Sequence, residues 1–267
     1  MKTKLRLIIS LLFLFGFFVG CKKELKKEEQ AENTTSKTIV TAGTRSGYIK
    51  PDDKYEFPDI SGMSDWKRPG IIQERKEALQ IPENVLANIS TAGLLETCLE
   101  YPYLIDIHFF DDFQKGFNVL TAQFNGFNEL LKRPDLVNVL LGKFYALTED
   151  VKGMRLLESV ERGRFSFRTF ALEFMLAQDA VLEKLNAEQE KELFLLNFKH
   201  REIKNSYSGV FGNWHIVSSA LLYAKTVMCD NAADSYANEL SKFIESPLYI
   251  DPNTFKYLED YINGKYK

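Results

Sequence analysis

The chain has 267 residues, with 34 Lys and Arg against 37 Asp and Glu, so its formal net charge at pH 7 is −3. This slightly acidic balance argues against nucleic acid as a partner, because non-specific binding to it depends on an excess of clustered positive charge. The length is sufficient for a domain with its own hydrophobic core.

Residues 1–20 have the pattern of a secretory signal peptide. A positively charged start is followed by an apolar run from Leu7 to Val19, which is shorter than the roughly 20 residues that a transmembrane helix needs. The small residue Gly20 then precedes Cys21. Cleavage between these two residues would leave the cysteine at the new N-terminus.

The residues around this cleavage point resemble the lipobox of bacterial lipoproteins: Phe18, Val19, Gly20 and Cys21. Phe18 departs from the Leu that is usual at its position. The resemblance implies a diacylglycerol thioether on Cys21 and a further acyl chain, such as palmitate, on its amino group. Several chains at about 0.8 kcal/mol per buried CH₂ would hold the protein on a membrane permanently. The alternative is an ordinary signal peptide, or an uncleaved anchor, with a chance cysteine.

A polar segment separates this cysteine from the rest of the chain. Residues 21–47 are rich in Lys, Glu, Gln, Asn and Thr and poor in apolar residues, a composition that predicts a disordered tether. A flexible segment of roughly 30 residues has a root-mean-square span of about 30 Å and reaches about 100 Å when extended. It would hold a folded domain clear of the lipid headgroups.

The residues after the cysteine bear on which membrane carries the anchor. Lys22 stands where an Asp resembles the inner-membrane retention signal of enteric lipoproteins, so the outer membrane of the cell envelope is favoured. The run KKELKKEE over residues 22–29 also resembles the surface-export tether of some Gram-negative lipoproteins. A periplasmic and a surface-exposed domain are both compatible with these residues.

Residues 48–70 predict an extended strap, because Pro51, Pro58 and Pro69 interrupt any regular helix there. A short hairpin is the most strand structure that the segment is expected to contain. Its aromatic residues would pin it to the surface of the domain; they are Tyr48, Tyr55, Phe57 and Trp66.

From residue 71 onward, apolar residues recur at helical spacing almost without a break. Residues 113–131 carry one stripe at steps of three and four, and Gly116 and Gly126 are expected to weaken or divide that helix. A second striped helix is predicted over 164–185, after a loop around Gly163. An almost wholly apolar helix is predicted over 210–229, at the centre of the domain.

These patterns predict an all-α fold over residues 71–267, an irregular multihelical array or bundle of α–α hairpins after the disordered N-terminal tether. About nine or ten helices follow from the periodicity. Ser90, Asn186 and Asp251 are expected as N-caps of three of them. The sequence has no fixed repeat period, so a strict repeat protein is not indicated.

Two cysteines remain beyond the lipobox, Cys98 and Cys229. Both lie in or at the end of apolar helical runs, where a free cysteine behaves as a small hydrophobic residue. Two buried thiols are therefore expected rather than a disulfide, although an exported location permits a bridge. Neither a structural metal site nor a cofactor is indicated, since the sequence contains no paired metal-ligand spacing and no phosphate-binding glycine loop.

The densest group of ionisable residues is DIHFFDD, residues 106–112. In a helix His108 would share a face with Asp111 and Asp112, a group that could bind a divalent cation or set a histidine base beside a carboxylate. The simpler alternative is a helix junction in which one of these acids caps the next helix. His215 is a further catalytic candidate, although a buried histidine bonded to a backbone carbonyl is the preferred interpretation.

Two pairs of residues are candidates for ligand binding. Arg164 and Arg168 alternate with phenylalanines over residues 161–170, a pattern that can hold an anion. Asn118 and Asn125 accompany the first apolar stripe and could line a groove for a sugar or a peptide. The plainer explanation is that the phenylalanines form the core and the polar residues face solvent.

The sequence thus predicts a lipid-anchored lipoprotein of the cell envelope whose helical domain binds a protein, peptide or glycan. No catalytic motif is recognisable, and helical arrays offer extended binding surfaces. The alternative is an envelope hydrolase or metal-dependent enzyme that uses His108 with Asp111 or Asp112. A structural element of an outer-membrane complex is a third possibility, and it would show a broad exposed apolar patch.

Overall fold

A computed structural model of the chain describes residues 48–63, 67–68, 70–110, 112–212, 214–230 and 234–266. The predicted signal peptide, Cys21 and the tether lie outside these ranges, as do Trp66 and Asp111. Within the ranges all regular structure is helical and no strand is present, so the fold is all-α and multihelical, as predicted. No helix in this part of the chain combines the length and apolarity that a membrane span requires.

The helices differ widely in length. The α-helices have these bounds: α1 Ile71–Ala78, α2 Glu83–Leu86, α3 Thr91–Leu99, α4 Phe113–Gln123, α5 Asn125–Leu130, α6 Leu136–Gly153, α7 Ser159–Leu176, α8 Asp179–Leu182, α9 Ala187–Asn205, α10 Trp214–Cys229, α11 Ala237–Glu245 and α12 Pro252–Tyr266. Short 3₁₀ helices lie between some of them: η1 Leu104–Phe109, η2 Met154–Leu156 and η3 Asp234–Tyr236.

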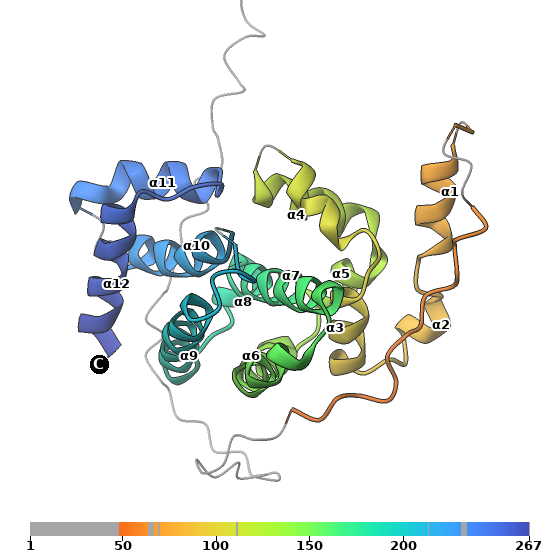
Figure 1. Ribbon diagram of the computed structural model, residues 1–267, viewed down its shortest axis with the longest axis horizontal. Helices are drawn as coiled ribbons and strands as arrows, with labels where there is room; N and C mark the ends of the chain where they lie inside the picture. Colours follow the sequence, from red (N-terminus) through yellow and green to blue (C-terminus); the bar gives the residue numbers. More distant parts are fainter. Residues whose placement is uncertain are drawn as a thin grey trace, which may run out of the picture. The chain divides into compact units, whose positions relative to one another are not determined.

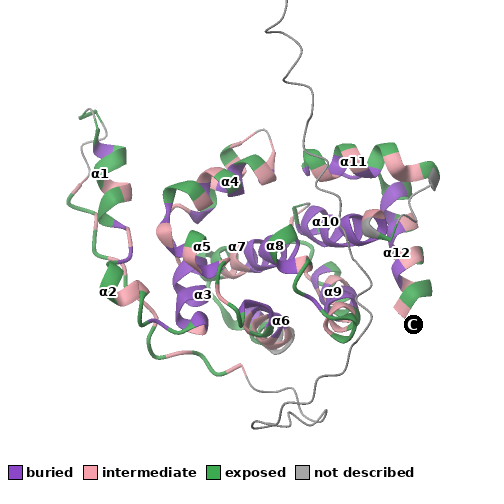
Figure 2. Cartoon of the chain, turned by 180° about the vertical axis from the view of Figure 1, so that it is seen from behind, coloured by how far each residue is buried: buried purple, intermediate pink, exposed green. Residues whose placement is uncertain are grey.

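Helices α7 and α10 form the centre of the array (Figure 1). Helix α10 packs against α7, α9, α11 and α12, and α7 packs against α3, α6 and α10. The chain therefore adds helices side by side, from α3–α5 through α6, α7, α9 and α10 to α11 and α12. Figure 2 shows buried residues concentrated along α3, α7 and α10, whereas α1 and α2 are mostly exposed.

Side-chain caps fix the starts of several helices. The Ser90 hydroxyl accepts a hydrogen bond of 2.9 Å from the backbone N–H of Gly93 at the start of α3. Asn186 and Gln189 form a reciprocal capping box at the start of α9, with distances of 2.9 and 3.0 Å. Each cap satisfies N–H groups that have no partner within the helix, and the expected N-caps of α3 and α9 are confirmed. The expected cap of α12 is confirmed as well, since the Asp251 carboxylate accepts from a first-turn N–H at 3.0 Å.

Several helix boundaries differ from those predicted. Gly163 lies inside α7 and not in a loop, because the packing of the helix from Ser166 onward outweighs the roughly 1 kcal/mol by which an exposed glycine disfavours it. The stripe over 113–131 divides at Phe124, whose φ of −124° and ψ of 119° are extended, and not at either glycine. Gly116 instead lets α4 approach η1 closely, since a Cβ there would lie 2.6 Å from the carbonyl oxygen of Ile107.

The stripe predicted as one helix over 164–185 is also divided. Helix α7 ends at Leu176, and the short helix α8 follows after two residues. The Gln178 side-chain amide donates a 2.8 Å hydrogen bond to the carbonyl of Phe174, one of the α7 carbonyls left without a helical partner.

Residues 48–63 form an extended strap, without a hairpin, that lies against α3. The Tyr48 hydroxyl donates to Glu96 at 2.6 Å, and the backbone N–H of Tyr55 donates to the Thr97 hydroxyl at 3.0 Å. The ring of Phe57 packs against two buried aromatic rings at centroid distances of 5.7 and 5.8 Å. The strap is therefore held to the helical array by both polar and apolar contacts.

Phenylalanines of the predicted stripes lie in the core, together with many leucines. Cys98 is a free, fully buried thiol that packs in the same core, and the side chain of Cys229 lies outside the described part. The buried phenylalanines of α4 to α7 and of the α4–α5 break are Phe113, Phe117, Phe124, Phe127, Phe144, Phe170 and Phe174.

Candidate functional site

His108 lies in η1 and is surrounded by aromatic rings. Its ring centroid is 4.8 to 5.1 Å from those of Phe113, Phe167, Phe170 and Trp214. Burial, together with the nearby charge of a second histidine, lowers the pKa of His108 to about 4. The imidazole is therefore neutral at physiological pH, and the described residues around its ring are aromatic.

Asp112 does not join His108. Its carboxylate accepts a hydrogen bond of 2.5 Å from the backbone N–H of Lys115 and caps α4. Asp111 lies outside the described residues. Among the side chains that the structure describes, no three His, Cys, Asp or Glu residues gather as metal ligands would, so the geometry gives the metal-dependent alternative no support.

His215 belongs to a buried network that the sequence did not predict. Its Nε2 lies 2.9 Å from the hydroxyl of Ser166, and its Nδ1 lies 3.9 Å from a carboxylate oxygen of Glu173. The order serine, histidine and acid is that of a hydrolase triad. The Nδ1–carboxylate distance is, however, too long for a hydrogen bond, and Ser166 can also donate to the carbonyl of Val210, 3.1 Å away.

Access to this network is closed in the structure. Ser166 is 4% exposed, His215 is 3% exposed and Glu173 is fully buried. None of these three residues lines a cavity described below. Together with Lys204, Ser218 and Ser219 they form what we call the core polar network, which joins α7, α9 and α10.

The ion pair at the centre of this network is between Glu173 and Lys204. Burial alone would raise the pKa of the Glu173 carboxyl, but the charge of Lys204 and the neighbouring His215 lower it to about 2. The hydroxyl of Ser218 donates to the second carboxylate oxygen at 2.6 Å. Lys204 also lies 3.2 Å from the hydroxyl of Ser219. The network thus pairs its buried charges and ties the central helices together.

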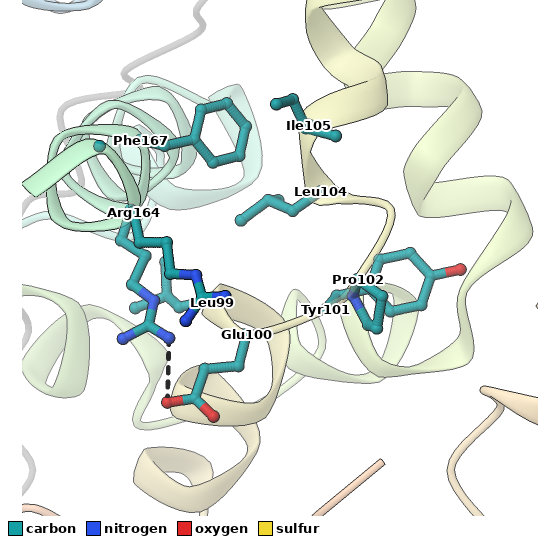
Figure 3. A pocket seen from close by; sticks show the side chains of 10 residues that line it. Leu99, Glu100, Tyr101, Pro102, Leu104, Ile105, Arg164 and Phe167 are labelled. Carbon is teal, nitrogen blue, oxygen red and sulfur yellow. Dashed lines mark ion pairs between the residues drawn. The ribbon is translucent and has the colours of Figure 1, made fainter. Parts of the chain in front are cut away.

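Arg164 and Arg168 do come together, in a cavity of about 510 Å³ between α7 and residues 99–105 (Figure 3). We call this cavity the arginine pocket. In Figure 3 Phe167 extends from α7 toward Leu104 and Ile105 on the opposite wall, and Arg164 runs from the same helix toward Glu100. The two cationic groups of the pocket therefore stand beside an apolar surface.

The charge of the arginine pocket is partly balanced by acids. Arg168 lies 3.2 Å from one carboxylate oxygen of Glu100, and Lys54 of the strap contacts the other oxygen. Burial would lower the pKa of Lys54, but its bonds to Glu100 and Glu56 raise it, so this residue is a full positive charge. Arg164 is more exposed and pairs with Glu161 at 2.7 Å.

A second hollow lies along α4, opposite the end of α11. It consists of two adjoining cavities of about 400 and 570 Å³ that share Gln114, Asn118 and Ala122. Ile244 and Glu245 of α11 line them on the other side. We call this hollow the amide cleft, because Gln114, Asn118, Asn128 and Gln178 line it.

The amides of the cleft are partly linked to one another. The Gln114 Nε2 group lies 2.9 Å from the amide oxygens of both Asn118 and Gln178. The Gln114 Oε1 atom is buried and has no hydrogen-bond partner among the described residues. An ion pair of 2.7 Å between Lys225 and Asp179 lies on the same surface. The cleft therefore presents both donors and acceptors without a strong net charge.

The predicted pair of asparagines is split between two roles. Asn118 lines the amide cleft, as the groove hypothesis requires. Asn125 instead bonds to the backbone N–H and carbonyl of Ile81 at 3.0 and 2.8 Å, and so fixes the chain between α1 and α2. The break at Phe124 separates the two residues onto different helices.

The chain matches no protein-family model, and neither a curated protein nor a solved structure is significantly similar to it. The features that bear on its function are therefore the N-terminal motif and the two hollows.

Proposed function

We propose that this protein is a lipid-anchored lipoprotein of the bacterial cell envelope, and that its amide cleft binds an extended peptide segment of a partner protein. The signal-peptide pattern and its lipobox, which ends in Cys21, support the proposal of a lipid anchor. Lys22 favours the outer membrane, and the domain faces the periplasm or the cell exterior.

The observation that carries the peptide assignment is the set of side-chain amides along one cleft. Each carboxamide offers donors and an acceptor, the same groups that a peptide backbone exposes. An extended peptide has no internal partners for its own N–H and C=O groups, so it needs such a surface.

The lining of the cleft favours a peptide over a glycan. Among the lining residues that the structure describes, the aromatic one is Phe117, which is 3% exposed and cannot stack on a sugar ring. Small and aliphatic residues lie between the amides, including Val119, Ala122 and Ala180. They leave room for the side chains of a bound peptide.

Peptide selection tests this assignment. Residues Val40–Lys267 form a compact unit by their own contacts, so a chain that begins at Lys22 keeps the domain and lacks only the anchor. This protein would be screened against a random peptide library, and the affinity of selected peptides measured by fluorescence anisotropy. We expect Asn118→Ala to weaken binding by about 5- to 30-fold, the loss of one or two hydrogen bonds of about 1 kcal/mol each.

The control for this experiment is Asn84→Ala, which removes an exposed asparagine of α2 that lines neither hollow. Its affinity should equal that of the parent protein. Failure to select any peptide, or equal affinities of Asn118→Ala and Asn84→Ala, would overturn the peptide assignment. A parallel glycan array that yields ligands sensitive to Asn118→Ala would replace it with a glycan site.

Mass spectrometry of the protein isolated from membranes tests the anchor separately. The expected species begins at Cys21 and carries the added mass of a diacylglycerol and an amide-linked acyl chain. A free Cys21 thiol with residues 1–20 still attached would contradict the lipoprotein assignment and leave the peptide assignment untouched.

A further inference from the structure

We propose that the arginine pocket is a second, independent binding site, and that it takes an amphipathic carboxylate with an aliphatic chain, such as a medium-chain fatty acid. The cavity of about 510 Å³ is within the size range of small-molecule sites. It lies between α7 and residues 99–105, and it shares no lining residue with the amide cleft.

The apolar part of the pocket matches the aliphatic chain of such a ligand. Leu99, Leu104, Ile105 and Phe167 contribute apolar side chains to it. Ile105 is 51% exposed, so the wall opposite α7 presents an apolar side chain to water. A hydrocarbon chain laid against this wall would remove that surface from water, which is the main favourable contribution to binding an apolar group.

The two guanidinium groups match the carboxylate. Arg164 and Arg168 are one helical turn apart on α7 and line the same cavity (Figure 3). Guanidinium groups bind carboxylates through paired N–H donors, a geometry that an ammonium or a hydroxyl headgroup cannot use. The pocket therefore discriminates by charge between ligands that carry the same chain.

The existing partner of Arg168 does not prevent this binding. Glu100 is shared between Arg168, 3.2 Å away, and Lys54 of the strap. When a ligand carboxylate takes the Arg168 guanidinium, Glu100 keeps its contact with Lys54 and is not left as an unpaired charge. The Arg164–Glu161 pair is on the surface, where solvent screens it and release of the arginine is easy.

Dodecanoate is the probe for this site, and its binding to residues 22–267 can be followed by calorimetry at pH 8, below the concentration at which it forms micelles. We expect saturable binding with one site per chain. The double variant Arg164→Gln/Arg168→Gln should bind at least tenfold more weakly. Arg162→Gln is the matched control, because Arg162 is on the same helix and does not line the pocket, and its affinity should stay within twofold of the parent protein.

Four comparisons make the result decisive. Ile105→Ser should also weaken dodecanoate binding. Because Ile105 is exposed, this change should leave the fold intact, so it tests the site even if the double variant does not fold. Dodecyltrimethylammonium should not bind at the site, and Asn118→Ala should bind dodecanoate as the parent protein does. No binding of dodecanoate, equal binding by the double variant, or equal binding of the cationic analogue would overturn the proposal. Tighter, arginine-dependent binding of dodecyl phosphate would overturn the carboxylate assignment in favour of a phospholipid headgroup.

Discussion

Glu173 is fully buried, and its negative charge is compensated inside the protein by Lys204. Removing two ions from water is expensive, so such a pair adds little net stability in comparison with apolar residues of similar volume. The pair is nevertheless costly to break, because the remaining ion keeps its desolvation penalty without its partner. Loss of Glu173 would leave the Lys204 ammonium as an uncompensated buried charge, so Glu173 matters most for stability in this network.

We predict that Glu173→Gln lowers the free energy of unfolding by about 3–5 kcal/mol, because it leaves the Lys204 ammonium buried beside a neutral amide. Adding Lys204→Met should restore part of the loss, since the second change removes the unpaired charge. Urea denaturation followed by circular dichroism measures both variants. A loss below about 1 kcal/mol in the single variant, or a further loss in the double variant, would show that the pair is not what holds these helices.

Local features of single residues could be predicted from the sequence, whereas the contacts of the core polar network could not. Asp112 could be foreseen as a cap, because a cap is set by the residues next to it in the chain. The contact between Ser166 and His215 joins residues 49 positions apart. It depends on how α7 crosses α10, and no periodicity within either helix reports that crossing. The interpretation of His215 as a buried histidine is confirmed, but its ring contacts the Ser166 hydroxyl and not the expected backbone carbonyl.

At the scale of helices, two glycines have opposite roles. Gly116 lies where α4 meets η1, and a Cβ there would be 2.6 Å from the Ile107 carbonyl oxygen and 2.9 Å from its Cα. Those atoms belong to the backbone and cannot rotate away. Gly163 lies on the exposed side of α7, with nothing within 4 Å of its would-be Cβ. Composition alone does not separate these two cases.

Alanine substitution tests this difference. Gly116→Ala should lower the free energy of unfolding by about 1–3 kcal/mol, because the added methyl group forces α4 away from η1. Gly163→Ala should raise it by about 0.4–1 kcal/mol, since alanine reduces the entropy of the unfolded chain and favours the helix. Chemical denaturation of both variants under the same conditions provides the comparison. Equal effects in the two variants would contradict the close approach of α4 and η1.

Spacing along a helix predicts a shared face only while the helix continues. Asn118 and Asn125 are two turns apart and would share a face on an unbroken helix. The extended residue Phe124 ends α4 between them, so Asn125 turns to the backbone of Ile81 and Asn118 alone lines the cleft. The divided stripe keeps its apolar residues in the core, and the pattern of apolar residues therefore gives no sign of the break.

At the scale of the whole domain, the fold class could be predicted and the order of packing could not. Apolar residues recurring every three or four positions require helices, and the phenylalanines and leucines on those stripes provide much of the core. The arrangement of α7 and α10 at the centre depends on many contacts between residues far apart in the chain, and no local sequence pattern indicates these contacts. The arginine pocket is formed by two segments about 60 residues apart, and for that reason only its α7 half was visible in the sequence.

The three histidines of the chain give the domain a common response to pH. The pKa values of His108 and His200 are lowered to about 4, and that of His215 is also lowered, in each case chiefly by burial. An unfolded histidine has a pKa of about 6.5, so between these values the unfolded chain binds protons that the folded domain does not. Folding stability is therefore fully present above about pH 6.5 and is lost as the pH falls toward 4.

We predict that the free energy of unfolding declines steadily from pH 7 to pH 5, with each fully buried histidine contributing a slope of at most about 1.4 kcal/mol per pH unit. His108 contributes less, because it is only half-buried. Urea titrations at half-unit steps measure the slope, and stopping at pH 5 keeps Glu173, with its pKa of about 2, ionised in the folded state. His200→Gln removes one titrating group. It should therefore reduce the slope of the unfolding free energy against pH by up to about 1.4 kcal/mol per pH unit, which corresponds to one proton, whatever its effect on stability at pH 7. A stability that is constant over this range, or a slope unchanged in His200→Gln, would mean that these imidazoles remain open to protons and that the core around α7, α9 and α10 is looser than the structure describes.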